Sequence, residues 1–409
     1  MRIFKISLHW QILIVITLAI PCGMFFAEYV LYIKWIGDLF LRALKMIIVP
    51  IVFTSIVSAV SGFNSPKDLG RLAGKTFAFY VLTTLIASFL GVFLVNVFSP
   101  GVGTDISFST PTSEINITKV SFTDQILSII PDNIFNDFAK GNLLGIIFFA
   151  IIFGVFLTKT ESKYRGVISD LFSGLYDLFM KMTIFIVKFT PIGVFALVSN
   201  IIASQGGSPD KILSILGSLG FYTIVVWLGC LIQGGLILPG IVYSFTRYNP
   251  YKHIKQMSVP LLTAFSTCSS GAALPLSIEA SQNKTGISSK VAGFVLPLGC
   301  TVNMNGTALY EGISAIFIAQ VYGIELTLVQ QFLIILTSVL AAIGSAGIPM
   351  AGLVMMSVVL SIVGLPLEGI GLILAVQQLC DMARSTINSY GDMCAAVVIA
   401  KSEGEKLNL

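Results

Sequence analysis

The chain has 409 residues, of which 55% are hydrophobic and only 11% are charged, with a formal net charge of +4. Soluble domains carry about 25% charged residues, so this composition excludes a soluble enzyme and indicates an integral membrane protein surrounded by the lipid bilayer. The Lys and Arg residues are scattered over loops and give no sign of nucleic-acid binding.

Six apolar runs in the first 246 residues have the length of a membrane span, which takes about 20 residues. They lie near 10–30, 36–63, 76–99, 142–158, 170–200 and 212–246. The first run resembles a signal peptide, but no A-x-A site follows it, so we expect a retained first helix. Residues 100–141 are rich in Ser, Thr, Asp and Gly and predict an exposed extracellular loop.

Basic residues mark one side of the membrane. They precede the first run and follow the second, fourth and sixth runs: Arg2 and Lys5; Lys67, Arg71 and Lys75; Lys159, Lys163 and Arg165; Arg247, Lys252 and Lys255. By the positive-inside rule, we expect the N-terminus and these connections in the cytoplasm. The chain would then lie in a cytoplasmic (inner) membrane.

The last third of the chain interrupts its apolar stretches with polar or flexible residues. Residues 256–281 have lysines on both sides and predict a re-entrant hairpin entered from the cytoplasm. Residues 288–320 predict a span broken at Asn303, Asn305 and Gly306. Residues 328–362 have Glu on both sides and predict an opposed hairpin entered from outside.

A final span at 366–400 ends at Lys401, which predicts a cytoplasmic C-terminus. The fold class is therefore predicted as an all-α polytopic membrane protein with eight transmembrane helices and two opposed re-entrant hairpins, arranged as inverted repeats. The alternative is that the interrupted segments are kinked spanning helices. Irregular backbone at membrane depth is tolerated where it lines a cavity, and paired interruptions mark a transporter's site.

The final apolar stretch also carries ionisable residues at helical spacing, namely Asp381, Arg384 and Asp392, with Ser385 and Asn388 between them. Each ionisable residue at bilayer depth costs roughly 2.5 kcal/mol or more. Such residues persist where they face a partner, a cavity or a ligand. The stripe indicates a binding site for a molecule that is both zwitterionic and charged.

Four motifs carry a resemblance to a known family. They are SSGAALP at 269–275, NMNGT at 303–307, AGIPMAG at 346–352 and DMARSTINSYGD at 381–392. With these motifs in this order, the chain resembles the dicarboxylate/amino acid:cation symporter family, the glutamate transporter homologues, over essentially its whole length.

The resemblance implies a homotrimer with an elevator mechanism. The scaffold would comprise residues 1–75 (spans 1 and 2) and 101–208 (the extracellular loop and spans 4 and 5). The mobile transport unit would comprise residues 76–100 (span 3) and 209–409 (span 6, both hairpins, and spans 7 and 8). The hairpins would act as gates.

The resemblance also assigns the substrate site. Arg384 would bind a side-chain carboxylate through its planar fork, Asp381 the ammonium group, and Asn388 the α-carboxylate. The remaining contacts would come from Ser269, Ser270, Thr307, Gly352 and Ser385. The implied substrate is L-aspartate or L-glutamate, and the preference between them stays open. The alternative for Arg384 is a structural ion pair with Asp381.

One departure lies in the first hairpin. Archaeal members can carry an arginine just before the serine pair, where this chain has Cys268. The six cysteines lie in or near apolar segments without a CxxC pair, which predicts small buried residues and no metal or disulfide role.

The coupling ion is predicted to be Na⁺. A first sodium site would use Gly299, Asn303, Asn388 and Asp392, and a second Thr301, Ala342, Ile343 and Ser345. A third would use Tyr80, Thr83, Thr84, Asn303 and Asn305. Asn305 occupies the position where the family motif has an aspartate. Gln377 occupies the position of a nearby family acid on the last helix. We expect the third site to be weak or absent, because a cation at membrane depth needs a counter-charge.

Other functions were weighed against this one. A proton-coupled symporter would need a titrating group on the pathway, and Glu311 is the candidate. A sodium-independent exchanger of acidic amino acids also fits the motifs. Enzymatic function is not expected, because the two histidines, His9 and His253, lie at segment edges and Ser389 stands where an aspartyl intramembrane protease has glycine.

Overall fold

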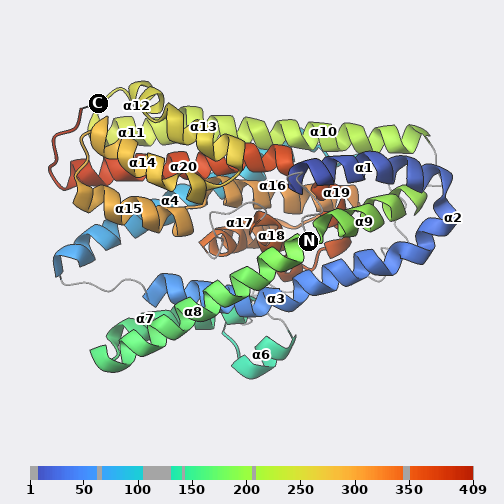
Figure 1. The fold of residues 1–409 in the computed structure, drawn as a ribbon, viewed down its shortest axis with the longest axis horizontal. Helices are drawn as coiled ribbons and strands as arrows, with labels where there is room; N and C mark the ends of the chain where they lie inside the picture. Colours follow the sequence, from blue (N-terminus) through green and yellow to red (C-terminus); the bar gives the residue numbers. More distant parts are fainter. Residues whose placement is uncertain are drawn as a thin grey trace, which may run out of the picture.

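The computed structural model describes residues 8–61, 67–104, 130–140, 143–204, 209–343 and 351–408. These residues form helices, and no strand occurs among them. The helices run side by side along the long axis of the molecule (Figure 1). The all-α class is therefore as the sequence predicts.

The described residues of the first half of the chain form eight α-helices, and a bend at Phe26 separates the first two. They are α1 (Leu8–Phe25), α2 (Ala27–Val30), α3 (Lys34–Ser61), α4 (Lys67–Phe98), α6 (Ile134–Lys140), α7 (Leu143–Lys159), α8 (Ser162–Val187) and α9 (Thr190–Ser204). Helix α3 packs against α7, α8 and α9, and α1 packs along α9.

The second half contains two long helices, the first and the last, and a series of shorter ones between them. They are α10 (Pro209–Ile232), a π-helical turn at Gln233–Ile237, α11 (Leu238–Thr246), α12 (Pro250–Gln256), α13 (Ser258–Thr267), α14 (Ser270–Asn283), α15 (Ser289–Val302), α16 (Asn305–Val321), α17 (Leu328–Ile343), α18 (Ala351–Val363), α19 (Ile370–Leu374) and α20 (Gln377–Ser402). Helices α13 and α14 pack against each other, as do α17 and α18. Each of these pairs folds back on itself.

The predicted interruptions are confirmed where the structure describes them. Cys268, between α13 and α14, is left-handed with φ 52°, a conformation that few non-glycine residues adopt. Helix α15 ends at Val302 and α16 begins at Asn305, as the Asn and Gly residues there predict. The tip between α17 and α18, including most of AGIPMAG, lies outside the described residues.

Two further apolar runs, each predicted as one span, are divided between two helices in the structure. The run near 170–200 divides into α8 and α9 at Lys188–Phe189, just before Pro191, whose fixed φ suits the first turn of a new helix. The run near 366–400 divides into α19 and α20 at Ala375–Val376. Residues 375 and 376, between α19 and α20, are neither proline nor glycine, so the residue types there do not predict the break.

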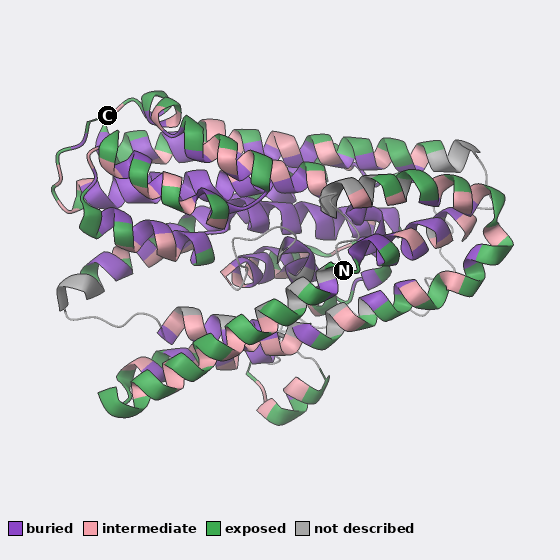
Figure 2. Ribbon diagram, viewed as in Figure 1, coloured by how far each residue is buried: buried purple, intermediate pink, exposed green. Residues whose placement is uncertain are grey.

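Buried residues gather in the central helices, and the outer helices are more exposed (Figure 2). Helix α16 is buried along nearly its whole length, with α4, α17 and α20 packed around it. Helix α8 instead exposes large apolar side chains, including Val167, Leu171 and Phe185. All six cysteines are free, and all but Cys22 are buried, as the sequence predicts.

Two helical stretches among the described residues are long and apolar enough to cross a membrane, Arg71–Phe98 and Leu213–Thr246. A pair bent by 113°, Thr17–Phe25 with Ala27–Phe40, could form a third crossing. The second stretch falls within the predicted sixth span, and the first overlaps the predicted third span but begins five residues before it.

Candidate functional site

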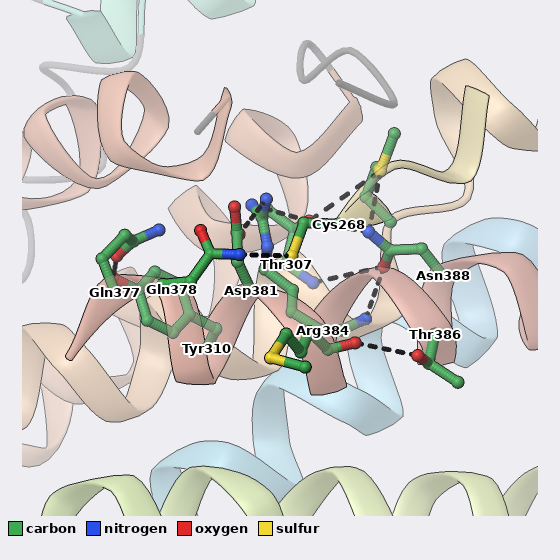
Figure 3. A network of polar contacts seen from close by, with 12 residues as sticks. Cys268, Thr307, Tyr310, Gln377, Gln378, Asp381, Arg384, Thr386 and Asn388 are labelled. Atoms are coloured by element: carbon green, nitrogen blue, oxygen red, sulfur yellow. Dashed lines mark hydrogen bonds and ion pairs between the residues drawn. The ribbon is translucent and has the colours of Figure 1, made fainter. Parts of the chain in front are cut away.

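The polar stripe of α20 lies in the interior of the protein and meets the start of α16. Asp381 and Arg384, one turn apart, form an ion pair whose side chains are 0% and 2% exposed. The alternative considered for Arg384, an ion pair with Asp381, is thus what the structure contains. Figure 3 shows both residues at the centre of a polar network.

Arg384 approaches two helices besides its own, α16 and α18. Its Nη1 lies 3.5 Å from the Thr307 hydroxyl oxygen on α16, and its Cζ lies 6.0 Å from the ring centre of Tyr310. A Cβ atom added to Gly352, at the start of α18, would overlap Nη1, so only glycine allows this approach. Within the described part of the chain, Arg384 Nε has no hydrogen-bond partner.

Asn388 joins α20 to the first turn of α16. Its Oδ1 accepts hydrogen bonds from the backbone N–H groups of Gly306 (2.8 Å) and Thr307 (3.3 Å). Its Nδ2 donates to the Thr307 hydroxyl (3.0 Å) and contacts the Met304 sulfur (3.1 Å). The break before α16 leaves these backbone amides without helical partners, and Asn388 satisfies two of them.

The turn between α13 and α14 lies close to this network. Ser269 caps α14 by accepting a hydrogen bond from the Ala272 N–H (3.2 Å), and Ser270 is 4% exposed. Gln378 Nε2 donates to the Cys268 sulfur at 3.0 Å, which fastens the turn to the start of α20. The predicted residues Ser269, Ser270 and Ser385 are all buried.

The predicted first sodium site brings the Asp392 carboxylate and the Asn303 amide group together. Asp392 Oδ1 accepts a hydrogen bond from Asn303 Nδ2 (2.9 Å), and both side chains are buried. A Cβ on Gly299 would collide with Asp392 Oδ1 and would lie 2.7 Å from the Tyr80 hydroxyl. Glycine therefore lets α15 approach the Asp392 carboxylate, and carbonyl and carboxylate oxygens of this kind suit a hard cation.

The predicted third site gathers at α4. Thr83 donates to Asn303 Oδ1 (3.4 Å), and Thr84 donates to Asn305 Oδ1 (2.8 Å). Tyr80 instead donates to the Val295 carbonyl (2.7 Å). Asn305 Nδ2 is buried without a hydrogen-bond partner among the described residues, and an N–H donor is a poor neighbour for a cation.

The second predicted sodium site is only partly described. Ala342 packs with Met304 and Ala308 in a small apolar cluster, which places the end of α17 beside the break before α16. Ile343 is half-buried at the end of α17, and Ser345 lies outside the described residues. The Thr301 side chain is exposed and donates to the Leu298 carbonyl at 2.9 Å.

Two polar residues of the network, Tyr310 and Gln378, were not predicted from the sequence. A third residue was predicted at a different position from the one it occupies. Gln377, expected near Asn305, instead accepts a short hydrogen bond from the Tyr310 hydroxyl, more than one turn farther along α16. Gln377 lies four residues before Asp381, a spacing that keeps both side chains on one face of α20. That spacing could have predicted that Gln377 belongs to the network around Asp381.

Glu311, the candidate proton carrier, lies on α16 and is 0% exposed. Among the described residues, neither of its carboxylate oxygens has a hydrogen-bond partner. An ionised carboxylate in such surroundings is costly, whereas a protonated carboxyl group costs much less.

Residues 8–402 match the sodium:dicarboxylate symporter family. The chain is 34% identical to the proton/glutamate-aspartate symporter of Escherichia coli (strain K12), which covers 98% of this chain and 94% of the relative. It is 35% identical to the proton/sodium-glutamate symport protein of Geobacillus stearothermophilus, with 98% and 96% coverage. It is 32% identical to the human neutral amino acid transporter A, with 90% and 76% coverage.

Proposed function

Because this chain belongs to the sodium:dicarboxylate symporter family, we propose that it imports L-aspartate or L-glutamate together with a coupling cation. Family membership makes it a symporter in a membrane and not an enzyme. The acidic substrate is the proposal, and it fits the names of the two bacterial relatives.

The observation that carries the proposal is the buried pair of Asp381 and Arg384. A bound acidic amino acid presents an ammonium group and carboxylates, so it can replace the partner of each side chain without leaving a charge unpaired. Arg384 can also receive a second carboxylate oxygen through Nε, which has no partner within the described ranges. A neutral amino acid would leave the guanidinium without that carboxylate.

The other substrate contacts follow from the same geometry. The Asn388 amide, which bridges to Thr307, would turn its Nδ2 toward the α-carboxylate. Ser269 and Ser270 would add hydrogen bonds from the α13–α14 turn, and Ser385 from α20. Gly352 would let the α17–α18 pair close over Arg384.

For the coupling ion we favour Na⁺ at two sites. Asp392 with Asn303 and Gly299 would form one, together with carbonyl oxygen from Asn388. Carbonyls near Thr301, Ala342, Ile343 and Ser345 would form the other. The third family site would be weakened, because Asn305 presents an amide donor where a carboxylate would neutralise the cation.

Proton coupling is the second candidate, and Glu311 is the observation that favours it. A buried carboxyl group without a partner can carry a proton across the membrane in its neutral form. The E. coli relative is named a proton symporter, and the Geobacillus relative is named for both ions. A sodium-independent exchanger remains the third possibility.

The topology that suits this function has eight spans and two opposed re-entrant hairpins, α13–α14 and α17–α18. Residues 76–100 and 209–409 would move as the transport unit, and residues 1–75 and 101–208 would form the scaffold of a homotrimer. The packing of α4 against α16 and α17 supports placing span 3 in the moving unit. Both termini would lie in the cytoplasm.

The test is uptake of radiolabelled L-aspartate and L-glutamate into proteoliposomes. One arm has an inward sodium gradient, and the other has a proton gradient without sodium. Sodium-dependent uptake with a Hill slope near or below two supports two intact sites. Uptake driven by external acid without sodium supports proton coupling through Glu311. Uptake that requires only amino acid inside the proteoliposomes supports exchange. Failure to take up either acid in all arms would overturn the proposal.

A further inference from the structure

A small apolar cavity of about 220 Å³ lies behind the substrate-binding stripe of α20. Thr386, Ile387 and Tyr390 of α20 form one wall. The opposite wall is the π-helical turn with Gly234 and Gly235. Because these α20 residues alternate along the helix with the stripe residues, the cavity and the substrate site share one helix from opposite faces.

The π-helical turn and its two glycines create the space. A Cβ on Gly234 would approach the Ile387 Cδ1 to 2.5 Å, so glycine sets how closely the turn meets α20. A Cβ on Gly235 would have no atom within 4 Å. The Gly235 carbonyl accepts a hydrogen bond from the Tyr251 hydroxyl (3.2 Å), which brings α12 over the turn. Such π turns often lie at functional sites.

The surface around the cavity is apolar and exposed. Leu231, which lines it, and Leu236 and Leu262, which neighbour lining residues in the chain, are 66%, 64% and 67% exposed. In an integral membrane protein, such a surface faces lipid chains, and the backbone beneath it is helical throughout. The cavity is therefore open to hydrocarbon chains.

Two lysines lie on the helix that contributes one wall of the cavity. Ile254 of α12 lines it, and the exposed Lys252 and Lys255 lie on the same short helix. Basic residues at the edge of the hydrocarbon attract anionic headgroups. The sequence predicts that these lysines are cytoplasmic.

We propose that the cavity binds one acyl chain of an anionic phospholipid whose phosphate lies against Lys252 and Lys255. The proposal goes beyond transport and holds whichever ion drives it. The bound chain would fill the space between the π turn and α20 and so support the helix that carries Arg384 and Asn388.

The experiment uses the full chain in proteoliposomes with phosphatidylglycerol that carries a photoactivatable group on one acyl chain, and a phosphatidylcholine probe with the same chain. Crosslinked sites are mapped by mass spectrometry. We expect labels in segments 230–235, 254–261 and 386–390, with phosphatidylglycerol preferred by roughly tenfold because two lysines face its headgroup. Labels confined to other segments would overturn the proposal.

Two variants test the two parts of the site. Gly235→Leu should fill the cavity and remove the labels, whereas Gly217→Leu on α10, where a Cβ also meets no atom within 4 Å, should keep them. The double variant Lys252→Gln, Lys255→Gln changes only exposed side chains. It should abolish the preference for phosphatidylglycerol while chain labelling persists. Unchanged labelling in Gly235→Leu, or an unchanged preference in the lysine variant, would contradict the site.

Discussion

Two stretches of α20 differ in how their charged side chains are partnered. Around Asp381 and Arg384, opposite charges are paired inside the protein. About two turns on, Asp392 accepts a hydrogen bond from the neutral Asn303 amide, and the Asn305 amide lies beside the neighbouring Gly391. The first stretch can exchange partners with a molecule that carries both charges, whereas the second can balance about one cation. Under the proposed function, this difference would let one helix bind both a substrate and an ion.

The largest effect should come from breaking the charge pair. Arg384→Ala leaves Asp381 buried without its partner, which costs about 3–5 kcal/mol. The Vmax/KM for L-aspartate uptake in proteoliposomes should fall at least about 100-fold, since about 1.4 kcal/mol is tenfold. Arg42→Ala, at an exposed arginine of α3, is the matched control and should transport normally. Near-normal uptake by a folded Arg384→Ala protein would remove the pair from the substrate site.

The next effect should come from neutralising the second stretch. Asp392→Asn keeps the shape of the side chain but removes its charge, and interactions with a charged group contribute about 1.5–3 kcal/mol. The sodium concentration for half-maximal uptake should rise at least about tenfold, with little change in the substrate KM at saturating sodium. Asp177→Asn, at an exposed aspartate of α8, provides the comparison. If sodium dependence is the same in both variants, the coupling site lies elsewhere.

A smaller effect should come from adding a carboxylate at the predicted third sodium site. Asn305→Asp replaces the unpartnered amide nitrogen with an oxygen and adds a negative charge beside Thr84. We expect the Hill slope for sodium in uptake assays to increase by about one, because a carboxylate can neutralise a further cation. Asn96→Asp, farther along α4, should not change the slope. An unchanged slope in Asn305→Asp would mean that the missing charge is not what weakens the third site.

The smallest effect concerns a third charged group, Glu403, at the end of α20. It pairs with Arg71 (2.6 Å) and Lys75 (2.7 Å), whose side chains are 66% and 36% exposed. Hydrogen bonds from Lys75 and Arg71 lower the pKa of the Glu403 carboxyl group. Its stabilising effect is therefore complete above the unfolded-state pKa and is lost as pH falls through the lower folded-state pKa.

Glu403→Gln should lower the melting temperature of the detergent-solubilised protein by only a degree or two at neutral pH, because exposed ion pairs contribute about 0–1 kcal/mol. The difference from the unchanged protein should shrink below about pH 4, where carboxyl groups become protonated, and in high salt. A difference that persists in acid would contradict an ionic origin. Glu405→Gln, at a carboxylate bonded to Ser288, is the neighbouring comparison.

Much of the fold could be predicted, because hydropathy and interruptions are local properties. The breaks at Cys268 and before Asn305 lie where Ser, Gly and Asn interrupt apolar runs. The breaks between α8 and α9 and between α19 and α20 were not predicted, because each lies inside a run whose average hydropathy is that of a single span. Hydropathy reports what a segment contacts and not the path of its backbone.

The sequence by itself determined the membrane class, the polar stripe and the placement of Asp381 and Arg384 on one helix face, since they are three residues apart. The ion pair between them was only an alternative until the structure showed it. Only the tertiary structure decided that Thr84 bonds Asn305, that Tyr310 bonds Gln377 and that an apolar cavity lies behind α20. The period of a helix fixes which side chains share a face. Which helix lies opposite that face depends on packing between segments far apart in the chain, and no local pattern carries it.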